Sequence, residues 1–124
     1  MSEDAIAKFK EAQRQGWKHF APLEALTTPA AARLVKFAKD ADVLIHDAQY
    51  RPEDYTNPTK PKQGWGHSTP EMAIAVAQAA NAGQLVLFHH EPTYDDATIA
   101  EIEANAQKLF PNVRAAYEGM ELKI

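Results

Sequence analysis

The stretch that decides the fold is Leu85-Val86-Leu87-Phe88-His89-His90-Glu91-Pro92. Its first four residues are apolar, and Gly83 separates them from an alanine-rich segment. A short apolar run with such boundaries predicts a strand buried on both faces. The run ends in two imidazoles, a carboxylate and a proline. Because ligands bind at the carboxyl ends of strands in open α/β sheets, we expect a functional site at this point.

Helical and strand patterns alternate on both sides of this stretch. The sequence predicts helices over 29–39, 70–81 and 95–109, strands over 43–45, 85–88, 113–117 and 120–124, and an exposed, mobile loop over 51–66. An N-terminal helix and an irregular connection are expected within 1–29. Crossovers of this length join parallel strands. We therefore predict one domain over 1–124 with an α/β fold, its helices packed on a largely parallel sheet.

Composition limits the class of protein. The 124 residues are 45% hydrophobic and 24% charged, as is usual for a soluble globular domain. A net charge of −4 offers no broad phosphate-binding face and argues against a nucleic-acid partner. No apolar run is long enough to span a bilayer, and we expect no membrane partner. The absence of cysteine excludes thiolate ligands and points to a cytoplasmic location.

Three side chains that could bind a metal or transfer a proton occur at or near strand ends. Asp47 follows the strand at 43–45, His89 follows the strand at 85–88, and His67 precedes the helix between these strands. Neighbouring parallel strands would bring all three to one edge of the sheet. A neutral imidazole could then bind a divalent metal while the carboxylate fixes its tautomer. Alternatively, Asp47 could favour the protonated form of His67, which would donate a proton to a leaving oxygen.

Structural roles are the competing interpretation. Paired histidines at a strand end can be satisfied polar groups at the rim of a sheet, and Asp47 can accept hydrogen bonds from loop amides. His46 is expected to point away from Asp47, because successive strand residues face opposite sides, and Glu91 is expected to be solvated. Three separate signals at one edge favour the functional interpretation.

The motifs also resemble a known family. Val43-Leu44-Ile45-His46-Asp47-Ala48, Gly66-His67-Ser68-Thr69 and Leu87-Phe88-His89-His90-Glu91-Pro92 resemble the C-terminal half of metallo-β-lactamase-fold hydrolases. The branch is the phosphodiesterase-like one, related to the tRNA 3′-processing endonucleases. The resemblance covers 30–124 and implies half of a four-layered αββα sandwich. It also implies that Asp47 and His67 form a catalytic proton-relay pair and that His89 is a metal ligand.

Metal-binding motifs of the family are missing. The first metal motif, His-x-His-x-Asp-His, occurs nowhere in the 124 residues. The resemblance implies a divalent ion, zinc or manganese, in the complete enzyme. A catalytic site of this kind uses about three protein ligands, and the chain alone can therefore lack the ion.

Three interpretations follow. In the first, the chain is a fragment or truncated copy of a larger hydrolase. In the second, the short chain is complete and catalytic, and a second copy or a separate chain with the missing N-terminal half completes the site. The third is a non-catalytic interaction or oligomerisation module derived from the fold. Because a half-sandwich exposes a sheet face that is normally covered, we expect a homo-oligomer or a partner half. As an enzyme, it would hydrolyse a phosphodiester or related ester, small molecules included, and the isolated chain would be inactive or very weak.

Overall fold

The computed structural model describes residues 29–62 and 66–124. The helix and connection expected before residue 29, and part of the 51–66 loop, lie outside these described residues. The elements are α3 (Pro29–Ala38), β1 (Val43–Asp47), α4 (Pro52–Tyr55), α5 (Pro70–Ala80), β2 (Gln84–Phe88), α6 (Asp96–Gln107) and β3 (Val113–Ala115). No described helix combines the length and the apolar character that a bilayer crossing requires.

The sheet has three strands in the order β1-β2-β3, and both pairings are parallel. Leu44 pairs with Leu85, and Asp47, the last residue of β1, pairs with Phe88, the last residue of β2. The carboxyl ends of β1 and β2 are therefore level with each other. The α/β fold with a parallel sheet, predicted from the alternation of patterns, is confirmed.

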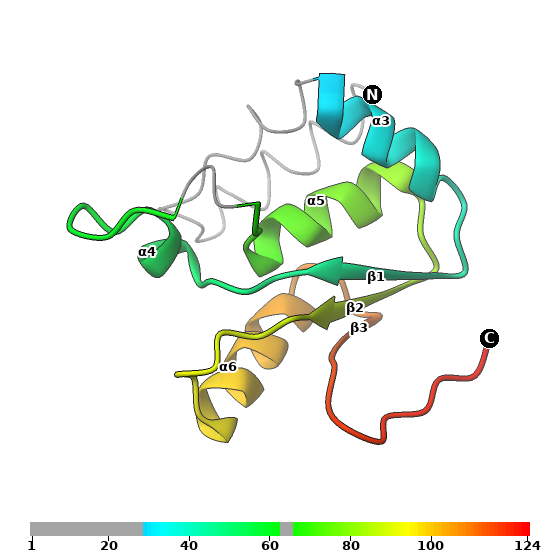
Figure 1. Cartoon of the computed structure of the whole chain (residues 1–124). Helices are drawn as coiled ribbons and strands as arrows, with labels where there is room; N and C mark the ends of the chain where they lie inside the picture. The colour runs from blue at the N-terminus through cyan, green and yellow to red at the C-terminus, as the bar shows by residue number, and fades with distance from the viewer. Residues whose placement is uncertain (1–28, 63–65) are drawn as a thin grey trace.

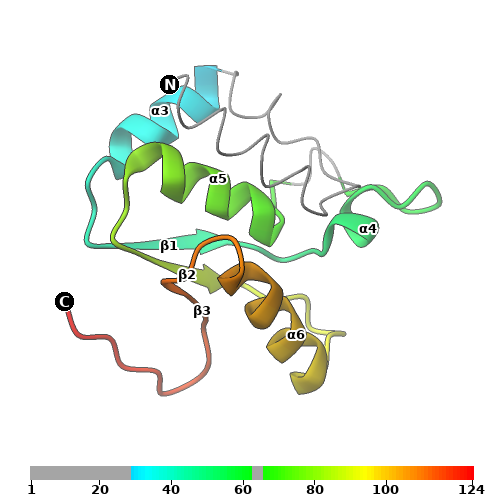
Figure 2. The same cartoon turned by 180° about the vertical axis from the view of Figure 1, so that it is seen from behind.

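The helices build a core on one face of the sheet. α5 contacts β1 and β2, α6 contacts β3, and these two helices contact each other. α3 packs on α5, on the side away from the strands (Figures 1 and 2). Leu85, Leu87 and Val113 are completely buried in this core. Four of the five alanines of α5 are buried as well, and their small side chains let the helix lie close to the strands.

The opposite face of the sheet is partly open. Ile45 is 60% exposed and Phe88 is 55% exposed. Side chains alternate along a strand, so Ile45 points away from the face that carries Leu44. The predicted burial of both strands on both faces is therefore wrong at Ile45 and Phe88. Only the core face is covered by the described helices at these positions.

The helix boundaries follow their capping residues. Thr69 precedes α5 and accepts a hydrogen bond from the backbone N–H of Met72 at 3.2 Å. Asn81 ends the same helix in the left-handed conformation. Asp95 caps α6 by accepting from the backbone N–H of Thr98 at 2.7 Å. Both helices begin where the sequence predicts, because a side-chain oxygen satisfies an otherwise unpaired amide at each start.

Two predictions outside the core are wrong. Residues 120–124 form no strand, because they pair with no neighbouring strand among the described residues, and they extend beyond β3 (Figure 1). The 51–66 loop contains the short helix α4, with Pro52 in its first turn. Beyond α4, the backbone N–H of Lys62 donates to the carbonyl of Tyr55 at 2.9 Å and closes the loop. Local turns thus give the described part of this polar segment a defined path.

Candidate functional site

Asp47, His67 and His89 meet at the carboxyl edge of the sheet. Asp47 ends β1, His89 directly follows β2, and His67 lies just before the cap of α5. One ligand-type atom from each residue lies within 4.8 Å of the others. The three segments that the sequence singled out therefore converge in space, while the role of each side chain stays a prediction.

The carboxylate of Asp47 is the centre of this cluster. Its Oδ1 lies 3.0 Å from the Nδ1 of His67 and 3.0 Å from the Nδ1 of His89. Its Oδ2 accepts a hydrogen bond from the backbone N–H of Ser68 at 2.8 Å. The two imidazoles stack with their centroids 5.0 Å apart, and the ring of Tyr50 meets His67 edge-on at 5.9 Å. Both expected uses of Asp47, accepting from a loop amide and orienting an imidazole, occur together.

This arrangement fixes the tautomer of both rings. An ionised carboxylate only accepts hydrogen bonds, so each Nδ1 that faces Asp47 carries a hydrogen. In each neutral ring the Nε2 then holds the lone pair. The same nitrogen is the atom that gains or loses a proton. Asp47 thus prepares His67 and His89 for proton transfer or for metal binding.

The environment keeps Asp47 ionised. Burial raises its pKa, but hydrogen bonds from His67, from the Ser68 amide and from His89 outweigh this effect. The resulting pKa lies below the ordinary value of 3.8. At neutral pH the carboxylate is therefore negative and accepts the hydrogen on the Nδ1 of each ring.

His89 has an unusual backbone conformation. Its φ is 63°, in the left-handed region that non-glycine residues seldom adopt. The turn occurs directly after β2 and accompanies the contact between the imidazole and Asp47. Backbone strain of this kind concentrates at functional sites.

The remaining described histidines bond elsewhere. The Nε2 of His90 lies 3.1 Å from the carbonyl oxygen of Ala116, so His90 is a polar group at the sheet rim. The Nδ1 of His46 lies 2.7 Å from the backbone oxygen of Asp47. Neither residue joins the group of three that could hold a metal.

Sequence reasoning missed the link between Gln49 and Glu91. The side-chain amide of Gln49 donates to the Glu91 carboxylate at 3.2 Å, and the Glu91 backbone N–H donates to the Gln49 carbonyl at 3.2 Å. Glu91, predicted to be solvated, is half-buried. Both residues follow paired strands within a few positions, so the parallel register was the signal that could have found this contact. The link ties together the two loops that carry Asp47 and His89.

Comparisons with known proteins give the relatives of this chain. No protein-family model matches it. It is 35% identical over 97 residues to ribonuclease Z of Bacillus subtilis (strain 168), covering 78% of this chain and 30% of the relative. It is 34% identical over 98 residues to ribonuclease Z of Bacillus velezensis, again covering 78% of this chain and 30% of the relative. The solved metallo-β-lactamase fold protein YhfI of Bacillus subtilis matches with a TM-score of 0.54 and 22% identity, covering 71% of this chain and 33% of YhfI.

The chain is a ribonuclease Z homologue with a metallo-β-lactamase fold. The resemblance predicted from the three motifs is thereby confirmed. This homologue spans about a third of the length of the relatives it matches. The relatives are named ribonucleases, enzymes that act on RNA.

The donor set of this homologue fits a divalent ion. Two imidazole nitrogens and a carboxylate oxygen lie within 4.8 Å of one another, and these ligand types suit zinc, manganese and iron alike. Three protein ligands is also the usual number in a catalytic zinc site. The resemblance implied only His89 as a metal ligand, whereas the group of three also contains Asp47 and His67. Because the Nδ1 of each ring is bonded to Asp47, each imidazole would bind an ion through its Nε2.

Proposed function

We propose that the chain is the C-terminal part of a metal-dependent hydrolase that cleaves a phosphodiester bond, with RNA as the favoured substrate. The observation that carries this proposal is the convergence of Asp47, His67 and His89 at one sheet edge. Kinship with ribonuclease Z supports the choice of a phosphodiester in RNA.

The three residues have distinct roles in this proposal. His89 would hold a divalent ion, zinc or manganese, through the nitrogen that does not face Asp47. When bound, such an ion polarises the phosphoryl group and makes water a stronger nucleophile near neutral pH. Protonated His67 donates the hydrogen on its Nε2 to the oxygen of the leaving group as the P–O bond breaks.

Asp47 serves both imidazoles. Its negative charge favours the protonated form of His67, and the bond from Oδ1 orients each ring. The Ser68 amide in turn holds the other carboxylate oxygen, at 2.8 Å. A carboxylate fixed on both oxygens keeps the proton donor in one orientation and reduces the entropy lost in the reaction.

The chain alone is expected to be inactive or very weak, because the upstream His-x-His-x-Asp-His ligands are absent from its sequence. The first test is therefore the location of a bound ion. Manganese(II), which is paramagnetic, is titrated into histidine-labelled protein, and the imidazole NMR signals are followed. We expect the signals of His67 and His89 to broaden before those of His90.

Two variants sharpen this test. His89→Ala removes the proposed ligand and should abolish the selective broadening. His90→Gln changes the adjacent histidine, which contacts the Ala116 carbonyl, and should leave the broadening intact. Uniform broadening of all histidines, or broadening that survives His89→Ala unchanged, would reject the proposal.

A non-catalytic oligomerisation module is the second candidate. The exposure of Ile45 and Phe88 on the open sheet face favours it, because apolar side chains on an uncovered sheet face can form an interface. Self-association without any preference of manganese for the cluster would support this module over the enzyme.

A further inference from the structure

A groove of about 540 Å³ opens beside the cluster. One side is the segment that follows β1, including Tyr50, Lys60 and Lys62, and the other includes Glu91 and Tyr94. Tyr50 connects the groove to the cluster, because its buried ring lies edge-on to His67 at 5.9 Å. The cluster and the groove therefore lie on either side of a common residue, Tyr50.

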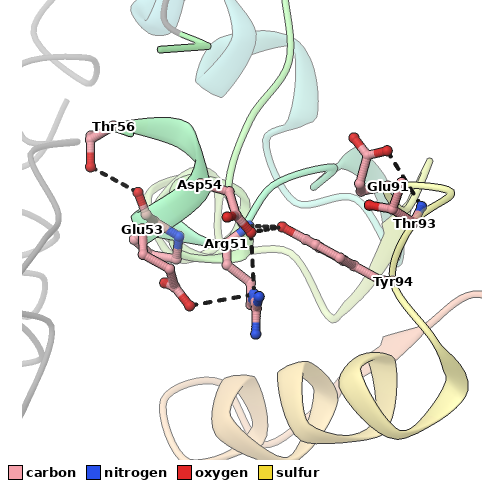
Figure 3. A network of polar contacts seen from close by, with 8 residues as sticks. Arg51, Glu53, Asp54, Thr56, Glu91, Thr93 and Tyr94 are labelled. Carbon is pink, nitrogen blue, oxygen red and sulfur yellow. Dashed lines mark hydrogen bonds and ion pairs between the residues drawn. The ribbon is translucent and has the colours of Figure 1, made fainter. Parts of the chain in front are cut away.

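The wall of the groove is anchored by a polar network. The Arg51 backbone N–H donates to the Tyr94 hydroxyl at 3.0 Å, and that hydroxyl donates to the Asp54 carboxylate. The Arg51 guanidinium lies 4.9 Å over the Tyr94 ring and 3.4 Å from carboxylate oxygens of Glu53 and Asp54 (Figure 3). These contacts join the segment with α4 to the segment that leads into α6, so the groove is a built feature of the fold.

The acidic groups of the groove already have partners within the protein. Asp54 is bound by Arg51 and Tyr94, and Asp95 accepts from Thr98 at 2.7 Å. Glu91 accepts from the Gln49 side chain at 3.2 Å. All three carboxylates are therefore hydrogen-bonded within the protein, and Asp54 is also paired with the Arg51 guanidinium.

Lys60 and Lys62 bring two ammonium groups to the same groove. The ammonium of Lys62 lies 5.8 Å from the centre of the Tyr50 ring, the ring that contacts His67. A lysine is a compact positive charge that binds phosphate without reading the base. The two rings are poorly placed to stack on a base, because Tyr50 is buried and the Arg51 guanidinium lies over one face of the Tyr94 ring.

Resting on the function proposed above, we propose that this groove is a subsite for the sugar-phosphate backbone of the RNA substrate. It would hold a phosphate neighbouring the one that is cleaved. Lys60 and Lys62 are its phosphate contacts, and the subsite is tolerant of base sequence. It would place the strand so that the scissile phosphate lies at Asp47, His67 and His89.

The test measures binding of a short fluorescein-labelled single-stranded RNA to the full chain by anisotropy, over a series of salt concentrations and with EDTA present. Each lysine–phosphate contact contributes about 0.7 to the slope of log K against log salt for a single strand. Lys60→Ala/Lys62→Ala should therefore weaken binding and reduce the slope by about 1.4.

The control is Lys36→Ala/Lys108→Ala, which removes the same charge from the last turn of α3 and the C-cap of α6. It should leave the slope nearly unchanged. Equal losses in both double variants, no loss in Lys60→Ala/Lys62→Ala, or no RNA binding by the unaltered chain would overturn the subsite. Because EDTA removes divalent ions, failure of the metal site shows only in the manganese titration, and the two failures are distinguishable.

Discussion

Replacing Asp47 by asparagine changes one charge and very little volume. The introduced amide can still accept from the Ser68 backbone N–H through its oxygen, but its nitrogen now faces His67 and His89. Because that nitrogen is a donor, each neutral ring must present a lone pair at Nδ1 and carry its hydrogen on Nε2. We therefore expect Asp47→Asn to reverse the tautomer of both rings.

The cost to stability follows from the three hydrogen bonds that Asp47 accepts. A hydrogen bond to a charged group contributes roughly 1 kcal/mol more than a neutral one. Since the Asp47 side chain is 28% exposed, solvent reduces the total, and we expect a loss of about 2 kcal/mol at neutral pH. For a chain of this length that corresponds to a fall in Tm of about 8 °C.

The lowered pKa of Asp47 determines how its contribution to stability changes with pH. The pKa of Asp47 is lowered in the folded state, so its stabilisation is present above the ordinary value of 3.8 and is lost as pH falls through the lower folded value. The difference in Tm between the wild type and Asp47→Asn should therefore be largest at neutral pH and disappear in acid.

Thermal melts and nitrogen-15 NMR of the imidazoles measure these two effects, and Asp42→Asn, a substitution just before β1, is the matched control. A Tm difference that is the same at neutral and acid pH would refute the reasoning. Unchanged tautomers of His67 and His89 in Asp47→Asn would also refute it.

Other consequences of the structure can be measured independently. Gly83→Ala should lower the free energy of unfolding in urea by about 1–3 kcal/mol, because the added Cβ would lie 2.9 Å from the Asp42 carbonyl oxygen. A stability equal to that of the wild type would contradict this prediction. Burial raises the pKa of Glu71 from 4.5 to about 7, so stability present below pH 4.5 is lost as pH rises through about 7. Glu71→Gln should lack this loss, which is about 3 kcal/mol in the free energy of unfolding. Parallel curves of unfolding free energy against pH for the two proteins would contradict the prediction. Finally, the chain should self-associate at micromolar concentrations, and Ile45→Lys/Phe88→Lys should shift its sedimentation towards the monomer, since charges on the open face oppose an interface. A wild-type chain that sediments only as a monomer would end that expectation.

The pattern of apolar runs in the sequence was sufficient to predict most of the fold. The apolar run before His89 and the run before Asp47 are separated by a capped, alanine-rich helix, and this order permits a parallel pair. Parallel pairing alone then brings the two strand ends together. His67 was predictable for the same reason, because it directly precedes the helix that joins the two strands.

The geometry of the cluster and of the groove depends on contacts between distant residues, which local sequence patterns do not predict. Both imidazoles bind the same oxygen of Asp47, and this contact accompanies the left-handed turn at His89, where the sequence has no glycine. The exposure of Ile45 depends on what covers the far face of the sheet, whereas an apolar pattern reports only that burial is favourable. The groove at Lys60 and Lys62 forms because Arg51 and Tyr94, distant in sequence, bind each other.

The alternation of side chains along β1 also limits how this chain can change in length. Losing one residue from Val43–Asp47 would turn the side chains that follow it to the other face of the sheet. The Asp47 carboxylate would then point towards the apolar core, and the His46 side chain would point to the open face. The turn at residues 57–62 has no such parity, and lengthening a surface loop costs only about 0.6 kcal/mol for each doubling. Insertions and deletions among natural variants should therefore collect in that turn, and the spacing within β1 should be invariant.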